Sequence, residues 1–273
     1  MIMPFYLSDF YGGLGNQLFS IITLYALAKK YNTTFSVNTD TLNATGFLSY
    51  YKIYFNVFTC LLQCPYYSVR DNTLPVIRYT VEQFKDYEFD VNITSTHIIY
   101  ICGLPMKYSL FHSYLDDIKL LFHSYKKSTY PTILFNNPKL CIAIRRFTDE
   151  KSEHWATSLE YYKKAIKHMS TKYNSCIIHI YTDTSDSSRV IIPFIQEYFG
   201  NSCINIEEFC GNKELQTDIE HLFTMFDYDN YILCNSTYHY WAALLTTNQN
   251  ATVLYPSDCE WYPHIACNNW IRL

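Results

Sequence analysis

Glycine is rare in this chain, and nearly half of it is gathered in one place. Only 7 of the 273 residues are glycine, and Gly12, Gly13 and Gly15 fall within four positions. A chain that otherwise avoids glycine uses it where the backbone needs extra conformational freedom. A strand-like segment at 4–10 precedes the cluster, and apolar residues at helical spacing follow it from Leu18. The cluster therefore marks a strand-to-helix turn.

The second half of the chain alternates between strand and helix patterns. Thr157-Ser-Leu-Glu160 reads as a capping box that opens a helix running to about Met169. The pattern predicts strands at 140–144, 176–181, 231–234 and 251–255, and further helices at 188–199, 217–226 and 238–246. Such alternation predicts an α/β fold with a parallel, doubly wound sheet. The stretch 43–130 is aromatic and irregular, and its elements are not ordered by pattern.

Charge and cysteine usage exclude several classes of protein. Lys plus Arg number 21 against 25 for Asp plus Glu, so the net charge is −4 and no nucleic-acid partner is expected. No apolar run reaches the roughly 18 residues of a membrane span, and from the residues at its start we expect no signal peptide. Ten cysteines lie mostly in apolar settings, and the Cys60–Cys64 pair lacks a second pair of metal ligands. We expect a cytoplasmic protein with reduced thiols and no bound metal or cofactor.

Polar side chains follow three of the predicted strands directly. Arg145 and Arg146, with Asp149 close behind, follow the first, Asp183 follows the second, and Asn235-Ser236-Thr237 follows the third. Taken singly, an Arg pair is typical of a surface ion pair and Asn-Ser-Thr of a helix cap. Ligands of open α/β sheets bind at the carboxyl ends of the strands, however, so the shared position favours one site. Paired guanidinium groups and a helix start favour an anion such as a phosphate.

The glycine cluster fits neither of two familiar phosphate loops. Leu18 stands at the third glycine position of the dinucleotide-binding fingerprint, and no Gly-Lys-Ser/Thr follows as in a P-loop. One interpretation is a tight turn with close helix–strand packing. The other is a ligand site, in which Gly13 and Gly15 let a ligand approach the backbone while Asn16 and Gln17 contact its polar groups.

Several motifs occur in an order that resembles the α-1,2-fucosyltransferase family (glycosyltransferase family 11). Gly12-Gly-Leu-Gly-Asn-Gln-Leu-Phe19 resembles its N-terminal motif, and Ile142-Ala-Ile-Arg-Arg146 its His-x-Arg-Arg donor motif. Thr182-Asp183 is similar to its Ser-Asp-Asp loop, and Asn235-Ser-Thr-Tyr-His-Tyr-Trp-Ala-Ala243 resembles its third motif. The resemblance covers residues 12 to 243.

The resemblance implies a GT-B-like fold, with two Rossmann-like domains and the active site in the cleft between them. Residues 1–135 would form the domain on the acceptor side and 136–273 the donor domain, with the last ~20 residues packing back on the first domain. It implies inverting transfer of L-fucose from GDP-fucose to a sugar hydroxyl of a glycan, in α-1,2 linkage and without an essential metal.

The same resemblance implies roles for individual residues. Arg145 and Arg146 would hold the donor diphosphate, Ser236 and Thr237 a phosphate, and Asp183 the guanine or ribose. Asn16 would lie near the transferred sugar, with Gly13, Gly15, Gln17 and Asn235 completing the donor site. Arg145 would act in catalysis by stabilising the leaving group, together with a carboxylate such as Asp149.

The chain departs from the family pattern at positions that contact the donor. The family's His, two residues before the Arg pair, is Ala143, and the Gly-Asp that follows the pair is Phe147-Thr148, which displaces the acid to Asp149. Two alternatives therefore stay open. One is a transferase for another nucleotide-activated deoxyhexose, and the other is a non-catalytic binder of a nucleotide or glycan.

Overall fold

The computed structural model describes residues 5–7, 12–37, 61, 64–66, 76–80, 98–102, 104–130, 138–145, 157–173, 176–182, 185–200, 207–210 and 215–273. The chain divides into two compact units, Met1–Tyr125 and Lys126–Leu273. The division falls inside one helix, before the boundary at residue 135 that the sequence predicts. The predicted hinge at 131–138 lies outside the described residues except for Pro138.

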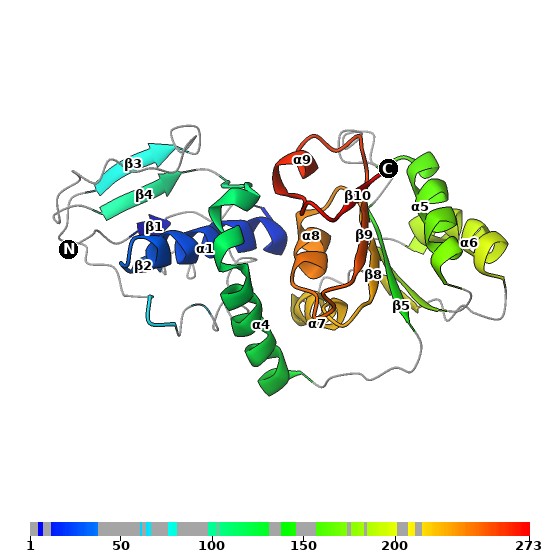
Figure 1. Cartoon of the computed structure of the whole chain (residues 1–273), viewed down its shortest axis with the longest axis horizontal. Coiled ribbons are helices and arrows are strands. Elements are labelled where there is room, and N and C mark those ends of the chain that lie inside the picture. Colours follow the sequence, from blue (N-terminus) through cyan, green and yellow to red (C-terminus); the bar gives the residue numbers. More distant parts are fainter. Residues whose placement is uncertain are drawn as a thin grey trace. The chain divides into compact units, whose positions relative to one another are not determined.

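The first unit is a parallel sheet with a long helix beside it (Figure 1). Its elements are β1 (Phe5–Leu7), α1 (Leu14–Lys30), β2 (Phe35–Val37), β3 (Val76–Thr80), β4 (Ile98–Cys102), the 3-10 turns η4 (Tyr108–Leu110) and η5 (His112–Tyr114), and most of α4 (Leu115–Thr129), whose residues from Lys126 on belong to the second unit. The strands run in the order β2-β1-β4-β3, and every pair in the sheet is parallel. The structure thus orders elements within 43–130 that the sequence pattern does not resolve.

Helix α1 follows the glycine cluster, as the sequence predicts, but it is buried on more than one face. The predicted apolar stripe includes Leu18, Ile21, Ile22 and Tyr25, and all four are buried. Residues between them, including Thr23, are buried as well. A helix covered all round belongs to the core of its unit rather than to its surface.

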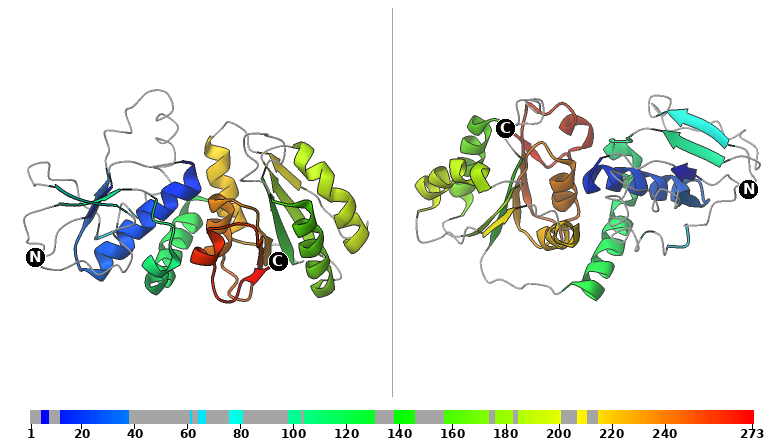
Figure 2. Two further views of the ribbon diagram at one scale, coloured as in Figure 1. Left: turned by 90° about the horizontal axis from the view of Figure 1, so that it is seen from above. Right: turned by 180° about the vertical axis from the view of Figure 1, so that it is seen from behind.

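The second unit contains a larger sheet. Its elements are β5 (Lys139–Ile144), α5 (Leu159–Lys172), β6 (Ile177–Thr182), α6 (Ser185–Phe199), β7 (Glu207–Cys210), α7 (Leu215–Met225), β8 (Asn230–Ile232), α8 (Thr237–Leu244), β9 (Thr252–Tyr255), α9 (Tyr262–Ile265) and β10 (Ile271–Arg272). All strands are parallel, in the order β10-β9-β8-β5-β6-β7. Helices α5 and α6 cover one face of this sheet and α7 and α8 the other (Figure 2). The predicted parallel α/β fold is confirmed for this half of the chain.

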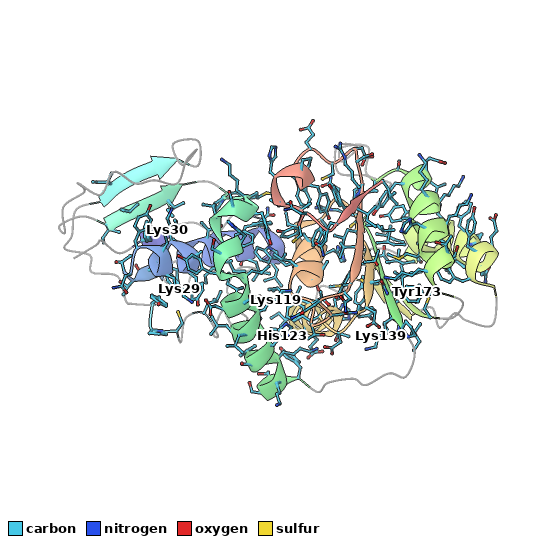
Figure 3. All side chains as sticks on the ribbon, in the orientation of Figure 1. Lys29, Lys30, Lys119, His123, Lys139 and Tyr173 are labelled. Atoms are coloured by element: carbon cyan, nitrogen blue, oxygen red, sulfur yellow. The ribbon has the colours of Figure 1, made fainter. Side chains whose placement is uncertain are left out.

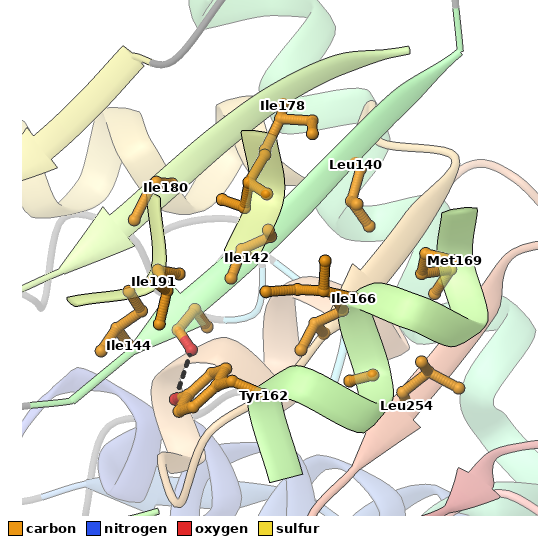
Figure 4. Close-up of a cluster of buried hydrophobic side chains, with 14 of the residues drawn as sticks. Leu140, Ile142, Ile144, Tyr162, Ile166, Met169, Ile178, Ile180, Ile191 and Leu254 are labelled. Atoms are coloured by element: carbon orange, nitrogen blue, oxygen red, sulfur yellow. Dashed lines mark hydrogen bonds between the residues drawn. The ribbon is translucent and has the colours of Figure 1, made fainter. Parts of the chain in front are cut away.

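The core between the sheet and α5–α6 is built from aliphatic side chains (Figure 4). Ile142 and Ile144 on β5, Ile180 on β6 and Ile166 on α5 are fully or almost fully buried there. Strands covered on both faces are expected to be apolar throughout, and β5 is buried at every position. This burial fixes the backbone of β5 up to its last residue.

One prediction about α5 is wrong in detail. The capping box places the helix cap at Thr157, but the N-cap is Ser158, whose side chain accepts a hydrogen bond from the Tyr161 backbone N–H at 3.2 Å. Thr157 is left for another partner. Its hydroxyl accepts from the backbone N–H of Asn235, 78 residues further along the chain, at 3.1 Å.

Five buried tyrosines in the second unit share one kind of bond. Each places its ring in the core and donates its hydroxyl proton to a backbone carbonyl. The pairs are Tyr161 with Leu254, Tyr162 with Ala143, Tyr231 with Met225, Tyr240 with Ile265, and Tyr262 with Cys234, at 2.6–2.9 Å. The Tyr162 bond ties α5 to β5 (Figure 4). These bonds satisfy carbonyls that would be costly to bury unpaired.

The end of the chain packs within the second unit. Ile271 and Arg272 pair with β9, and the Leu273 N–H donates to the Tyr255 carbonyl at 3.1 Å. The predicted contact of the last residues with the first domain stays a prediction. Six cysteines with described side chains are free thiols. Among the described helices, none is long and apolar enough to cross a membrane.

Candidate functional site

The two edges of the larger sheet differ in character. Hydrogen bonds within the protein occupy the edge at which the strands begin. The Lys139 N–H donates to Asp229 at 2.8 Å, and the Tyr173 hydroxyl donates to Asn230 at 2.9 Å. Lys139 and Tyr173 lie near this edge in Figure 3. The opposite edge holds the carboxyl ends of β5, β6 and β8, which are neighbours in the sheet. The predicted polar segments therefore start at one edge.

Arg145 and Asn235 are brought together at that edge. Arg145 directly follows β5 and is exposed, and its Nη1 donates to the backbone carbonyl of Asn235 at 3.3 Å. Asn235 itself is buried. Two residues 90 positions apart in the sequence are thus adjacent because β5 and β8 pair in parallel.

Asn235 is held from several sides. Its backbone N–H donates to Thr157, and its side-chain Oδ1 accepts from the Trp261 indole N–H at 2.7 Å and from the Cys259 thiol at 3.2 Å. Burial raises the pKa of the Cys259 thiol to about 11, so this thiol keeps its proton and can donate. The sequence predicts that Asn235 binds the nucleotide-sugar donor. Its Oδ1, however, already accepts two hydrogen bonds from within the protein.

Helix α8 begins at this edge, directly after Asn235. Ser236 is the N-cap, has an extended backbone and is 9% exposed, yet its side chain makes no capping hydrogen bond. Thr237, the first helical residue, is half-buried. The first N–H groups of a helix have no partner within the helix, and they attract an anion together with a nearby hydroxyl. Arg145, bonded to the preceding residue, adds a positive charge beside them.

His239 belongs to the same region and was not singled out from the sequence. It is the third residue of α8, and its Nδ1 lies 3.6 Å from the Cys234 sulfur. Burial, with the charges of Arg145 and His221, lowers the pKa of His239 to about 3. The imidazole is therefore neutral at physiological pH. A His two residues after the Asn-Ser-Thr start of a helix was a signal that sequence reasoning could have used.

We expect His239 to make the stability of the fold depend on pH. Its folded-state pKa lies below the unfolded value of about 6.5, so protons bind the unfolded chain preferentially once the pH falls below that value. The free energy of unfolding should fall by up to about 1.4 kcal/mol for each pH unit between about 6.5 and 3. Urea titrations of the wild type and His239→Gln at pH 7, 6, 5 and 4 measure the difference. If the free energy of unfolding falls equally with pH in the two proteins, His239 is not the source of the pH dependence.

The glycine cluster of the first unit forms a tight entry into α1. Gly12 has a left-handed backbone (φ 71°), and Gly13 is the N-cap of α1. Gln17 is buried, and its side-chain amide donates to the Gly12 carbonyl at 3.1 Å. Gln17 therefore supports the turn itself, while Asn16 is half-buried against Gly12 and Gly15 is buried. The structure thus shows the tight turn of the first interpretation, and the ligand site of the second stays a prediction.

Gly12 and Gly13 form a matched pair for testing this turn. A Cβ at Gly12 would adopt a left-handed backbone and lie 2.5 Å from Asn16 Nδ2, whereas a Cβ at Gly13 would meet nothing within 4 Å. Gly12→Ala should lower the free energy of unfolding by about 1–2 kcal/mol, the usual cost of a left-handed alanine. Gly13→Ala should change it by less than about 1 kcal/mol. Denaturant unfolding of both variants provides the measurement, and equal losses would show that backbone conformation is not the cause.

Three of the predicted site residues lie outside the described residues: Arg146, Asp149 and Asp183. Their roles stay predictions. Within the part of the chain that the structure describes, no group of three or more His, Cys, Asp or Glu side chains is placed to hold a metal ion.

Comparisons with known proteins bear on the fold. No protein-family model matches the sequence, and no curated protein sequence matches it. Among solved structures, an Arg-to-Lys mutant of Arabidopsis thaliana FUT1 in complex with GDP is similar, with a TM-score of 0.52 and 12% identity over 93% of this chain and 70% of that chain. POFUT1 in complex with GDP-fucose gives 0.47 at 10% identity over 92% and 97% of the two chains. Fucosyltransferase NodZ from Bradyrhizobium gives 0.48 at 12% identity over 90% and 93%.

The similarity to FUT1 assigns the fold class. Parallel sheets covered by helices in this chain match the α/β architecture of a GT-B fucosyltransferase. The chain thus has a fucosyltransferase-like fold.

Proposed function

We propose that the chain is a glycosyltransferase that moves L-fucose from GDP-fucose to a hydroxyl of a glycan acceptor. The finer part of the proposal is α-1,2 linkage with inversion at the anomeric carbon. Two arguments support fucosyl transfer from GDP-fucose: the sequence motifs that resemble α-1,2-fucosyltransferases, and the fold shared with FUT1, whose structure was determined with GDP. The α-1,2 linkage and the inversion rest on the resemblance of the motifs alone.

One observation carries the proposal. The start of α8 brings together the first-turn backbone N–H groups of a helix, a buried N-cap residue whose hydroxyl makes no capping hydrogen bond, and the exposed Arg145 next to it. An arrangement of this kind suits a phosphate, because helix N–H groups and a guanidinium both bind oxyanions. A diphosphate leaving group is the oxyanion that a nucleotide-sugar donor supplies.

The proposed reaction needs charge stabilisation and one proton acceptor. The acceptor oxygen forms a bond to the anomeric carbon, the bond to the β-phosphate oxygen breaks, and the electron pair leaves with the diphosphate. Arg145 stabilises the negative charge that grows there, with Arg146, Ser236 and Thr237 binding the phosphates. A carboxylate such as Asp149 takes the hydroxyl proton. Asp183 contacts guanine or ribose, and the glycine loop with Asn16 faces the sugar.

A second candidate rests on Ala143. Ala143 stands where the α-1,2-fucosyltransferase motif has a His. Its buried methyl group cannot form a hydrogen bond with the nucleotide sugar. The resemblance implies that this position lies beside the donor, so a different nucleotide-activated deoxyhexose is the alternative donor. A non-catalytic relative would bind the nucleotide sugar but would not release GDP from it.

Thermal unfolding with GDP tests the proposal directly. GDP should stabilise the protein without added metal, by about 2.7 kcal/mol when its concentration is 100 times the dissociation constant. Arg145 and the α8 N-terminus replace a divalent cation, so EDTA should leave the stabilisation unchanged. Release of GDP on mixing with GDP-fucose and candidate acceptors then separates an enzyme from a binder. A GDP effect that EDTA abolishes would contradict metal-independent binding.

A further inference from the structure

The connection between β5 and α5 is tied at both ends to one residue. Arg145 stands at its start and donates to the Asn235 carbonyl, and Thr157 stands at its end and accepts from the Asn235 N–H. Thr157 is 1% exposed, so this bond is shielded from water. A single peptide segment therefore fixes both ends of the connection that carries the Arg pair.

A distant part of the chain fixes the Asn235 side chain. The indole N–H of Trp261 and the thiol of Cys259 both donate to Oδ1. The Trp261 ring is itself stacked on Tyr262, with centroids 4.1 Å apart and an angle of 23° between the planes. With its ring held in this way, Trp261 holds Oδ1 at one position.

We infer that Thr157 and Trp261 are positioning residues for ligand binding, which they serve by holding Asn235 so that its carbonyl orients Arg145. The inference rests on the proposed function. A long, exposed arginine has many rotamers, and its alignment depends on the groups that its guanidinium contacts. Because Ser236 follows Asn235 directly, the same contacts also set where α8 starts.

The neighbouring Tyr262 supplies a matched control. Its hydroxyl donates to the Cys234 carbonyl at 2.8 Å, one residue before Asn235, so this bond supports the same segment through a neighbouring residue. Tyr262→Phe and Trp261→Phe each delete one hydrogen bond to this segment and keep an aromatic ring. If general rigidity of the segment is what matters, the two variants will behave alike.

The experiment compares binding with stability in the full chain. Dissociation constants for GDP and for inorganic pyrophosphate are measured by calorimetry for the wild type, Thr157→Val, Thr157→Ser, Trp261→Phe and Tyr262→Phe, and melting temperatures are recorded for each. Partners behind a ligand-binding group are typically worth 10–100-fold in affinity at metal sites. We expect Thr157→Val and Trp261→Phe to weaken both ligands about tenfold. Thr157→Ser, which keeps the hydroxyl, should restore wild-type affinity, and Tyr262→Phe should lower the melting temperature with little change in affinity.

Each result decides a different claim. Wild-type affinity in folded Thr157→Val and Trp261→Phe overturns the inference and leaves the proposed function standing. An equal loss of affinity in Tyr262→Phe also overturns it, because the effect would then be one of general packing. If Thr157→Val does not fold, Trp261→Phe and Thr157→Ser still decide the question. A wild type that binds neither GDP nor pyrophosphate overturns the proposed function together with the inference.

Discussion

Replacing Arg145 with alanine is expected to lower the turnover of fucosyl transfer about 10²–10³-fold, or about 3–4 kcal/mol of transition-state stabilisation. The side chain follows a strand buried at every position, and its guanidinium lies against the Asn235 carbonyl. Negative charge on the diphosphate grows as the glycosidic bond breaks, so a donor fixed in advance helps the transition state more than the ground state. The measurement is kcat with GDP-fucose and a glycan acceptor.

Three further variants sharpen this prediction. Arg145→Lys should recover little activity, because an ammonium cannot reproduce a forked contact. Arg272→Ala is the matched control, since Arg272 is another exposed arginine that donates to a backbone carbonyl, that of Ser257 at 2.8 Å. We expect Arg146→Ala to act differently and to affect stability as well, because the sequence predicts Arg146 to be an ion-paired support rather than the direct ligand of the diphosphate. If Arg145→Ala keeps most of its activity while Arg146→Ala does not, the two roles are exchanged.

Trp241→Ala should destabilise the second unit by about 3–5 kcal/mol, the usual loss for deleting a buried aromatic side chain. Trp241 is fully buried on α8, the helix whose first turn borders the candidate site. A domain is typically stable by only about 5–15 kcal/mol, so this single change removes a large share of the total. Urea unfolding followed by circular dichroism measures the loss.

Trp270 gives the comparison for Trp241. It is only half-buried, although its ring lies 5.4 Å from that of Tyr240, the residue next to Trp241. Trp270→Ala should therefore cost clearly less than Trp241→Ala. Equal costs for the two variants would mean that cavity formation in the core does not govern the stability of this unit.

The sequence predicts the second unit well because its central strands β5, β6 and β8 are almost entirely buried. Short runs of apolar residues such as 140–144 are typical of strands buried in a core, and segments with a helical pattern separate these runs. Strand β7 (Glu207–Cys210) escaped prediction because two of its four residues are glutamates, and β10 because it has only two residues. Such strands form because a neighbouring strand is available, which no local pattern records.

The first unit was harder for a different reason. Its aromatic residues are spread evenly, so periodicity is weak through 43–130. Helix α4 nevertheless carries readable signals, with Asp116 and Asp117 in its first turn and Lys126 and Lys127 in its last. In the structure, Lys29 of α1 pairs with Asp117, and Lys126 pairs with Asp227 within the second unit.

The candidate site was predictable only in part. The placement of Arg145 beside Asn235 follows from parallel strands whose carboxyl ends meet at one edge. The contacts of Asn235 with Thr157 and Trp261 do not follow from any spacing, since they join residues 78 and 26 positions away. Local capping rules predict Thr157 as the N-cap of α5, whereas its hydroxyl accepts a hydrogen bond from Asn235. Supporting contacts of this kind depend on the completed fold.

The tyrosine hydroxyls described above have a consequence for how far such a sequence can drift during evolution. Each hydroxyl is bonded to the main chain, as in the bond from Tyr162 to the carbonyl of Ala143. A carbonyl is present whichever residue occupies the position, so mutation of the partner to another apolar residue leaves the bond intact. Selection then has to preserve only the tyrosine and the path of the backbone. A core tied together in this way can exchange most of its side chains over generations and still retain an architecture shared with a protein of 12% identity.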